Sequence, residues 1–572
     1  MSISASAPWL KFYGDTPAHL TYPKLTVYQM VKAAGEKYPN NVAYEFMGKK
    51  TTYAEFLKRI ELTARSYLAM GIRKGDRVTI CMPNCPQAVD SFYALNRIGA
   101  VSNMIHPLSA AREIRFYLDF SHSKAILTLD QFYPKVASIQ NDLKQPTPIL
   151  VARVKDELPP VLAVGYSLTQ GRKLPKLPAK GNFLRWNDFL TAGRRWKLPL
   201  PADDGKDTDG ASILYSGGTT GTTKGILLSN LNFNALGLQT IAASGFAPID
   251  GLKMLSVMPV FHGFGLGIGI HTALIGGATC ILVPQFNVKT YADLLIKKQP
   301  NIIPGVPTLF EALLRAENLE GTDLSCLKGV FCGGDSLSIE LKKKVDDFLK
   351  AHNANVQIRQ GYGLTECVTA SCLTPKDYHR VGSIGVPFPD TYYKICKPGT
   401  TEEVDANVEG EICLTGPSVM VKYVDNPEET ANTLRRHSDN RLWLHTGDLG
   451  KMDEDGFVYF SQRIKRMIVT SGYNVYPGQL ENIIDGHEKV LLSCVIGVKD
   501  PYKMQKVKAF VVLKPGIEPT DEVKAELMDY CRQHIAKYAM PYDIEFRAEL
   551  PKTLVGKVAY RALEEEEAEK NK

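Results

Sequence analysis

Amphipathic helical patterns alternate with short apolar runs along most of this chain. Residues 27–34 and 86–98 have helical spacing, whereas 77–82 and 125–129 are typical of buried strands. Further strands are expected downstream, at 212–215, 280–283, 302–304 and 329–332. Helices that alternate with β-branched runs favour a sheet with helices packed on its faces. We therefore predict an α/β fold for this part of the chain.

The length of the chain predicts more than one hydrophobic core. It has 572 residues, of which 44% are hydrophobic and 23% charged. These proportions are ordinary for a globular protein and exclude disordered, collagen-like and coiled-coil classes. At roughly 100 to 200 residues per domain, several cores or one large domain with a satellite are expected. From 410 to 459 the strands look short and separated by turns, which favours an antiparallel subdomain.

A domain boundary is predicted near 462–466, where the pattern changes to that of a small α+β unit. The expected elements are a helix at 477–487, strands at 491–498 and 507–513, and a helix that opens at Thr520. The apolar positions of this last helix fall on one face, at Val523, Leu527, Cys531 and Ile535. The glutamates 564–567 and the charged residues after them are expected in solvent. We predict a large domain at 1–462 and a small domain at 467–572.

One long segment without charged residues raises the question of a membrane span. Residues 254–288 contain no Lys, Arg, Asp or Glu, and they are long enough to cross a bilayer. Pro259, Pro284 and six glycines interrupt the segment, and such a chain satisfies its backbone groups poorly in lipid. We expect a core strand and a buried helix that lines a cavity.

Cysteine usage and charge bear on the compartment and on partners. The eleven cysteines include no CxxC pair, and the first residues lack the pattern of a signal peptide, so reduced and mostly buried thiols in the cytoplasm are expected. The net charge of +7 does not indicate a nucleic-acid binder. Residues 153–197 carry ten Lys or Arg against three acidic residues. This segment is expected on the surface, with peripheral contact to an anionic membrane, at the inner membrane face, as the alternative.

The strongest local signal for chemistry is a glycine- and hydroxyl-rich loop at 215–225, directly after a predicted strand. It reads Tyr215-Ser-Gly-Gly-Thr-Thr-Gly-Thr-Thr-Lys-Gly225. Glycines let backbone N–H groups approach a phosphate, and hydroxyl groups add donors. The loop is not a Walker A motif, because Thr223 stands where a glycine belongs directly before Lys224, and Gly225 stands where a Ser or Thr belongs. The sequence therefore predicts a phosphate site of another kind.

Four more motifs follow this loop in order. They are Gln360-Gly-Tyr-Gly-Leu-Thr-Glu366, Leu444-His-Thr-Gly-Asp448, the stretch 463–477, and Pro551-Lys-Thr-Leu-Val-Gly-Lys557. Together the five motifs resemble those of the acyl-adenylate-forming (AMP-binding) superfamily, which includes acyl-CoA synthetases, peptide-synthetase adenylation domains and luciferases. The form of the loop is most similar to that of bacterial medium- and long-chain fatty acyl-CoA synthetases. The resemblance implies the same architecture of a large N-terminal and a small C-terminal domain.

The resemblance implies an ATP-dependent acyl-CoA ligase that uses Mg²⁺, ATP and CoA on a small-molecule carboxylic acid. The carboxylate attacks the α-phosphate of ATP to give acyl-AMP and pyrophosphate, and the CoA sulfur then attacks the acyl-AMP. A carboxylic acid is already ionised at pH 7, so this first step needs charge neutralisation and alignment rather than a general base.

Carried over to this chain, the resemblance assigns roles to individual residues. Those for ATP are Thr219, Thr220, Gly221 and Lys224 at the phosphates, Thr365 at the α-phosphate, Glu366 at Mg²⁺, Gly333, Gly334, Asp335, Gly361 and Tyr362 around the adenine, and Asp448 with Arg463 at the ribose. Those for catalysis and movement are Lys557 as the adenylation lysine, His262 as a gate of the acyl site, 463–466 as a hinge with Lys465 at its centre, and Ser471, Gly472 and Tyr473 at the CoA channel. The resemblance also raises acetylation of Lys557 as a regulatory hypothesis.

Several alternatives stay open at this point. Asp448 has the alternative of a turn cap, Glu366 of a surface acid, and His262 of a core histidine. The motifs also depart from the family pattern at Gly217, Thr223, Gln462 and Arg466. The uncharged segment 254–288 favours a medium to long acyl chain and argues against amino-acid activation, with an aromatic or bile-acid substrate or a carrier-protein acceptor as alternatives. A non-catalytic acyl-nucleotide sensor is the rival outside the enzymes, and both a monomer and a homodimer are compatible with the sequence.

Overall fold

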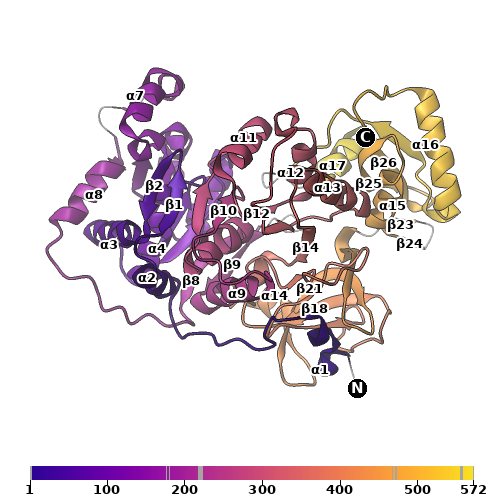
Figure 1. The fold of residues 1–572 in the computed structure, drawn as a ribbon, viewed down its shortest axis with the longest axis horizontal. Helices are drawn as coiled ribbons and strands as arrows, with labels where there is room; N and C mark the ends of the chain where they lie inside the picture. The colour runs from indigo at the N-terminus through magenta and orange to yellow at the C-terminus, as the bar shows by residue number, and fades with distance from the viewer. Residues whose placement is uncertain are drawn as a thin grey trace.

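The computed structural model describes residues 3–175, 177–178, 181–216, 223–466, 468–470, 473–553 and 558–570, and of residues 3, 170, 465, 473 and 474 it describes the backbone alone. The large N-terminal domain contains two broad sheets and a smaller antiparallel sheet, and the C-terminal domain has a sheet of its own (Figure 1). The predicted fold class is confirmed.

The first broad sheet, sheet A, is parallel in its centre and antiparallel at both edges. Its order is β16 (Val386–Pro387), β15 (Cys372–Leu373), β14 (Ile358–Tyr362), β13 (Gly329–Cys332), β12 (Ile302–Gly305), β10 (Lys253–Ser256), β11 (Thr279–Leu282), β1 (Val42–Phe46) and β2 (Lys49–Thr52). The strands from β14 to β1 run parallel to one another. Because parallel strands end at the same edge of a sheet, the residues that follow β13 and β14 lie side by side.

The second broad sheet, sheet B, is built in the same way. Its order is β19 (Lys422–Tyr423), β9 (Lys224–Ser229), β8 (Gly210–Ser216), β4 (Val101–Met104), β3 (Arg77–Cys81), β5 (Ala125–Leu129), β6 (Ile149–Ala152) and β7 (Phe183–Arg185). The strands from β8 to β7 are parallel, while β9 and β19 add antiparallel partners at the edge. The glycine-rich loop connects β8 with β9.

Helices cover the faces of these sheets, as the alternating pattern predicts. They are α1 (Ile3–Ser6), α2 (Val27–Lys37), α3 (Tyr53–Ala69), α4 (Pro86–Arg97), α5 (Ala111–Ser121), α6 (Tyr133–Ala137), α7 (Pro160–Leu168), α8 (Trp186–Arg195), α9 (Asn230–Ala243), α10 (Ala273–Ile275), α11 (Val288–Lys298), α12 (Pro307–Leu314), α13 (Ile339–Ala351) and α14 (Pro427–Thr433). Buried side chains between the sheets and these helices form one large core. All eleven cysteines are free and ten of them are buried, which confirms that part of the prediction.

The uncharged segment 254–288 folds into the interior of the protein. It consists of β10, a nine-residue π-helix at Phe264–Thr272, α10 and β11, and the π-helix is buried along its whole length. Inside it, His271 accepts a hydrogen bond from the Tyr93 hydroxyl at 3.0 Å and donates one to Asn234 at 2.9 Å, and burial lowers its pKa to about 3. The predicted strand and buried helix are confirmed. Among the described helices, none has the length and apolar character needed to cross a bilayer.

The antiparallel subdomain predicted for 410–459 is present, but one of its strands is long. The sheet has the order β17 (Tyr392–Cys396), β18 (Gly410–Thr415), β21 (Leu442–Met452) and β20 (Leu434–Arg436), and β22 (Val458–Arg463) pairs with β21. The eleven-residue β21 pairs with β18, β20 and β22 along different parts of its length, with irregular register in two places. The short-strand expectation was wrong for β21, because bulges break its side-chain alternation without ending the strand.

The C-terminal domain has the predicted α+β composition. Its strands are β23 (Ile468–Thr470), β24 (Tyr473–Val475), β25 (Val490–Asp500), β26 (Met504–Leu513) and β27 (Asp543–Phe546), and its helices are α15 (Pro477–Asp485), α16 (Asp521–His534) and α17 (Tyr560–Lys570). The Thr520 hydroxyl caps α16, and the predicted apolar face of that helix packs into the domain core. The boundary itself, with domains 1–462 and 467–572, stays a prediction.

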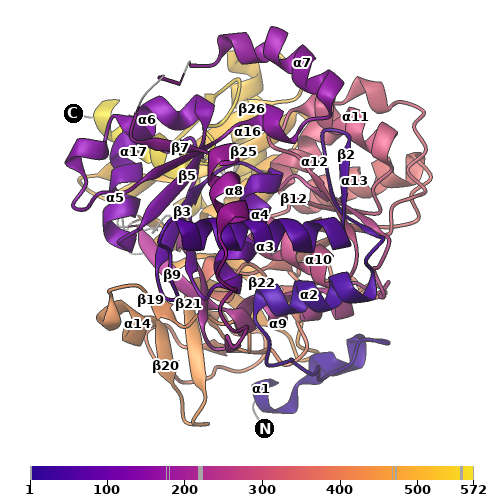
Figure 2. The same ribbon diagram turned by 90° about the vertical axis from the view of Figure 1, so that its left-hand side faces the viewer.

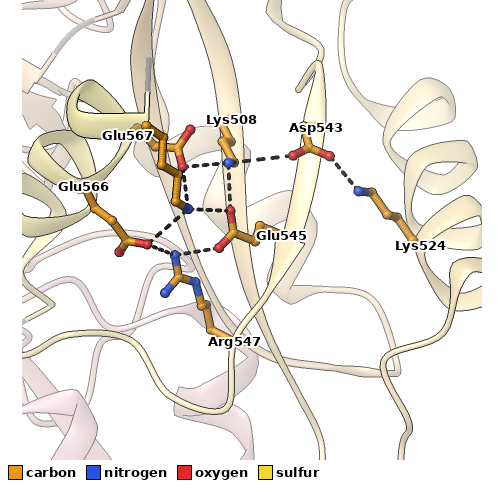
Figure 3. A network of polar contacts seen from close by, with 8 residues as sticks. Lys508, Lys524, Asp543, Glu545, Arg547, Glu566 and Glu567 are labelled. Atoms are coloured by element: carbon orange, nitrogen blue, oxygen red, sulfur yellow. Dashed lines mark hydrogen bonds and ion pairs between the residues drawn. The ribbon is translucent and has the colours of Figure 1, made fainter. Parts of the chain in front are cut away.

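The expectation that 564–567 lies in solvent is wrong for Glu567, while Glu565 is exposed. Glu567 on α17 is buried and accepts a hydrogen bond at 2.8 Å from Lys508 on β26, whose side chain is also buried. Glu545 on β27 accepts from the same ammonium at 2.8 Å, and Lys570 on α17 contacts Glu567 at 3.0 Å. Figure 3 shows these groups in one network with Asp543, Arg547 and Glu566. The network fixes α17 on the sheet through Glu566 and Glu567.

We expect Glu567→Ala to destabilise the C-terminal domain by about 2 to 3 kcal/mol, because it leaves a buried ammonium with one close carboxylate instead of two. Urea unfolding of the full chain and hydrogen exchange of the α17 amides measure the effect. Glu565→Ala, on the exposed side of the same helix, is the matched control and should change little. The double variant Lys508→Met/Glu567→Leu should recover most of the loss. Equal effects of Glu567→Ala and Glu565→Ala would contradict a role for the network in stability.

Candidate active site

The centre of the candidate site is a tight turn after β14. Residues Thr365–Cys367 form a 3₁₀ turn, and Val368 follows with φ 63° and ψ −56°. This conformation is strained for a β-branched residue, at a cost of about 1 to 3 kcal/mol. The Val368 carbonyl lies so close to Gly263 that a Cβ there would be 1.7 Å from the oxygen. Glycine at 263 is therefore required, and the start of the π-helix is held against the turn.

Glu366 on this turn is buried and bonded to sheet B. Its carboxylate accepts a hydrogen bond from the Tyr423 hydroxyl at 2.7 Å, and its carbonyl accepts one from the Met420 amide at 2.7 Å. Burial and the Glu366 charge raise the pKa of Tyr423 well above its usual value, so the phenol remains a donor. The alternative that Glu366 is a surface acid is excluded. Carboxylate oxygens are the ligands that Mg²⁺ prefers, so Glu366 fits the predicted metal role chemically.

Lys224 lies on the other side of the same tyrosine. Its ammonium is 4.8 Å from the centre of the Tyr423 ring, a distance typical of a cation–π contact, and it forms an ion pair with Glu429 on α14. The structure thus brings Lys224 and Glu366, predicted from two separate motifs, to one residue of β19. An ammonium held here by a carboxylate and a ring face is positioned at the end of the glycine-rich loop.

A second group combines three predicted residues. The Tyr362 hydroxyl donates to the Asp448 carboxylate at 2.6 Å, and the Arg463 guanidinium approaches the same carboxylate at 3.4 Å. Asp448 and Arg463 are cross-strand partners on β21 and β22. Burial and the neighbouring carboxylate raise the pKa of Tyr362 well above its ordinary value. Burial works against the charged form of Arg463, but the Asp448 carboxylate raises the pKa of the guanidinium overall.

Buried polar side chains support the backbone just before Asp448. Glu411 on β18 accepts hydrogen bonds from the Gly447 amide at 3.0 Å and pairs with His445 at 2.8 Å. Burial opposes ionisation of Glu411, yet His445 and the Gly447 amide hold its pKa below the usual range. The second His445 ring nitrogen lies 2.9 Å from His437. Glu411, Cys413 and His445 place possible metal-binding atoms within 4.8 Å of one another. The hydrogen bonds among them explain why these residues lie together, and the bond from Gly447 to Glu411 supports the turn at Gly447.

The residues predicted around the adenine occupy the carboxyl edge of sheet A. Gly333 directly follows β13, and Gly361 lies on the neighbouring strand β14. A Cβ on Gly333 would lie 3.4 Å from the Gly361 oxygen and 3.9 Å from the Phe264 ring. Gly334 has φ 82°, a conformation that favours glycine. These glycines present no side chains at this edge of sheet A, near the start of the π-helix.

Asp335 and His262 lie at the margins of this edge. Asp335 is exposed, and its carboxylate accepts from the Ser336 amide at 2.9 Å. It faces the C-terminal domain: burial opposes the charge of Arg466, but Glu481 and, more weakly, Asp335 raise the pKa of that guanidinium. His262 is half-buried, and its Nδ1 accepts from the Phe264 amide at 3.1 Å. Its role as a gate stays a prediction.

Part of the predicted site lies outside the described residues, namely Thr219, Thr220, Gly221, Ser471, Gly472 and Lys557. For Lys465 and Tyr473 the description is limited to the backbone, which places Lys465 in a 3₁₀ turn at Ile464–Arg466 and Tyr473 at the start of β24. Thr365 opens the turn that carries Glu366, and the roles of all these residues stay predictions.

The sequence did not reveal some residues that build the site. The residues that were missed are Tyr423, Glu429 and Glu411. They contact the predicted residues or their neighbours, but they lie outside the five motifs. Tyr423 lies 57 residues from Glu366, and Glu411 lies 34 residues from His445. His445 had one available signal, since it falls inside the Leu444–Asp448 motif. Pairings at such separations depend on the sheet register and not on a local pattern.

Comparisons with known proteins agree with this arrangement. The family model described as "AMP-binding enzyme" matches residues 31–424, and that of the AMP-binding enzyme C-terminal domain matches 479–557. The chain is 35% identical to a long-chain-fatty-acid–CoA ligase of Bacillus subtilis over 99% of both chains, and 31% identical to one of Yersinia pestis over 98% of both.

Among solved structures, the ATP-bound form of MatB from Rhodopseudomonas palustris matches with a TM-score of 0.80 at 25% identity, covering 96% of this chain and 100% of that one. The apo form of the same protein matches with a TM-score of 0.71 over the same shares of both chains. The two family models together span most of the chain, and the relatives match it from end to end. The chain therefore belongs to the family of AMP-binding enzymes, and its most similar curated relatives include bacterial long-chain fatty acid–CoA ligases, as its five motifs predicted.

Proposed function

We propose that this protein is an ATP-dependent acyl-CoA ligase that activates a fatty acid of medium to long chain through acyl-AMP. The observation that supports this most strongly is the grouping of Tyr362, Asp448 and Arg463. Tyr362 stands four residues before the buried Glu366 in the sequence. That grouping offers a carboxylate for ribose hydroxyls beside a carboxylate for Mg²⁺, as an adenylate-forming site requires. The activity named for the B. subtilis and Y. pestis relatives supports the same conclusion.

In the first step, ATP and the acid are aligned and the charge on the phosphates is neutralised. Lys224, with the glycine-rich loop, holds the phosphates, and Glu366 is the ligand for the Mg²⁺ that accompanies them. Asp448 accepts hydrogen bonds from the ribose hydroxyls and is kept in place by Tyr362 and Arg463. The acid's carboxylate oxygen then attacks the α-phosphorus and pyrophosphate leaves. Alignment of this kind supplies much of a rate enhancement without any proton transfer.

Lys557 acts on the same phosphorus from the C-terminal domain. The described residues on either side of it are paired with each other: Lys552 and Val558 form a β-bridge, and the Ala559 amide donates to the Pro551 carbonyl at 2.7 Å. The ion network on α17 anchors the chain just beyond this point. Because both flanking segments are anchored in the C-terminal domain, we propose that Lys557 enters and leaves the site when that domain moves.

The proposed hinge at 463–466 coincides with a change of attachment. Arg463 is paired with Asp448 of the N-terminal domain, whereas Arg466 is paired with Glu481 and stacked on Tyr560 of the C-terminal domain, 4.8 Å from its ring centre. Lys465 lies between these two ion pairs, so rotation of the C-terminal domain about this residue leaves both pairs intact. The better match to ATP-bound than to apo MatB supports an adenylation-like arrangement here. Rotation would replace Lys557 by 471–473 and admit the CoA thiol.

The proposal predicts CoA-dependent release of pyrophosphate when the protein is given MgATP and an acid. In a panel from acetate to oleate, with benzoate and cholate added, we expect an optimum among medium to long chains, because the buried segment 254–288 offers apolar surroundings. Coupled pyrophosphate detection and mass spectrometry of the thioester measure it. Turnover confined to ring acids would contradict the fatty-acid assignment. Adenylate without thioester would indicate a carrier-protein acceptor, and no turnover with any acid would favour the sensor.

Lys557→Ala should lower acyl-AMP formation by a factor of about 100 to 1,000, which is typical for loss of one positioned charge at a transition state. The binding of ATP and the thiolysis of supplied acyl-AMP should change much less, since both rely on other groups. Single-turnover kinetics separate the two steps. Lys552→Ala, which removes an exposed lysine five residues away, is the matched control. Equal rates for the two variants would refute the role given to Lys557.

A further inference from the structure

Helix α7 exposes an apolar surface that the proposed activity does not use. Figures 1 and 2 show α7 at the margin of the molecule, projecting from the end of sheet B. The exposed fraction is 83% for Val161, 50% for Leu162, 62% for Val164 and 56% for Leu168. Single exposed apolar residues are common on proteins, but four on one nine-residue helix are a concentration that calls for an explanation.

The spacing of these residues gives the helix two distinct faces. Val161, Val164 and Leu168 recur at intervals of three and four residues, so they share one side of the helix. Ala163 and Tyr166 point the other way and pack against the protein core. The helix is therefore anchored by its inner face and exposes aliphatic side chains on the other side, where Val164 and Leu168 border a shallow hollow.

The charge of the surrounding segment is strongly one-sided. Residues 153–197 have ten Lys or Arg and three acidic residues, a net charge of +7. The whole chain also has a net charge of +7, so the rest of the protein is balanced. Near α7, Asp156 is paired with Arg153 at 2.9 Å, and Glu157 is buried against Arg59 at 2.7 Å. Both acids are thus occupied within the protein.

Exposed basic side chains follow the apolar stripe closely in the chain. Arg172 and Lys173, in the 3₁₀ turn Gln170–Lys173 that packs against α7, are both exposed. An aliphatic stripe flanked by cations is the pattern of helices that lie in the interface of an anionic bilayer, with the apolar face among the acyl chains and the cations at the phosphates.

We propose that α7 and the basic turn after it, residues 160–173, dock the protein onto an anionic lipid surface. The helix has nine residues and a transmembrane helix needs about 20, so it lies in the interface and does not cross. A second copy of the chain is a poor occupant, because two segments of net charge +7 repel each other. Docking stands independently of the proposed activity, although a fatty acid dissolved in that bilayer would then be at hand.

Sedimentation of the full chain with vesicles tests the proposal. With vesicles of 30% phosphatidylglycerol in phosphatidylcholine at 0.1 M NaCl, we expect binding that falls at least tenfold in pure phosphatidylcholine or at 0.5 M NaCl, because salt screens the cations. Val161→Asp/Val164→Asp should weaken binding to the anionic vesicles at least tenfold. The matched control is Val381→Asp/Val408→Asp, which places the same two charges at exposed valines elsewhere and should bind as the unmodified protein does.

A second variant tests the charge separately from the apolar stripe. Arg172→Gln/Lys173→Gln should weaken binding to anionic vesicles and reduce its salt dependence, while melting and gel-filtration behaviour stay unchanged. The proposal is overturned if the unmodified protein does not bind anionic vesicles, or if the α7 and control variants lose binding equally. It is also overturned if the α7 variant changes only the oligomeric state, since the stripe would then be covered by a second copy.

Discussion

The hydrogen bond from Tyr423 to the buried Glu366 carboxylate joins the two halves of the candidate site. Tyr423 belongs to the edge of sheet B, whereas Glu366 follows the last parallel strand of sheet A. A buried carboxylate without a donor would cost several kcal/mol, so the two sheet edges are held in register by this contact. The strain at Val368 is maintained by the same packing, since its carbonyl fills the space that Gly263 leaves. Lys224, Glu366 and the start of the π-helix all meet at this junction.

Around that junction the fold separates a fixed part from a part suited to movement. Glu411 accepts a hydrogen bond from the amide of Gly447, the residue before Asp448, and the Tyr362 hydroxyl donates to the Asp448 carboxylate. Both contacts hold Asp448 in place. Arg466, three residues beyond Arg463, belongs by its contacts to the other domain. The nucleotide is thus expected to stay in place while the small domain exchanges one loop for another. Two reactions with opposite needs, a cation at the phosphorus and then room for a thiol, can share one site in this way.

The sequence predicted the parts of the site that are local and missed those that depend on distant pairing. Local motifs singled out Glu366, Asp448 and Lys224, because the roles proposed for them require particular residues at fixed spacing. Tyr423 was missed because nothing beside it in the chain indicates a partner 57 residues away. The error at Glu567 has the same cause: an acidic run looks solvated until Lys508, distant in sequence, is placed against it. Helices and strands with clear periodicity, such as α4 and β5, followed from the pattern alone.

The transfer of an isotope from the acid to the nucleotide tests the central claim most directly. If the carboxylate oxygen attacks the α-phosphorus, the new C–O–P bridge keeps that oxygen on phosphorus when the thiol breaks the acyl C–O bond. With a fatty acid labelled by ¹⁸O in both carboxylate oxygens, the account predicts one ¹⁸O in each AMP released and none in the pyrophosphate. Label in orthophosphate or pyrophosphate, with unlabelled nucleotide, would mean attack at another phosphorus and would contradict the account.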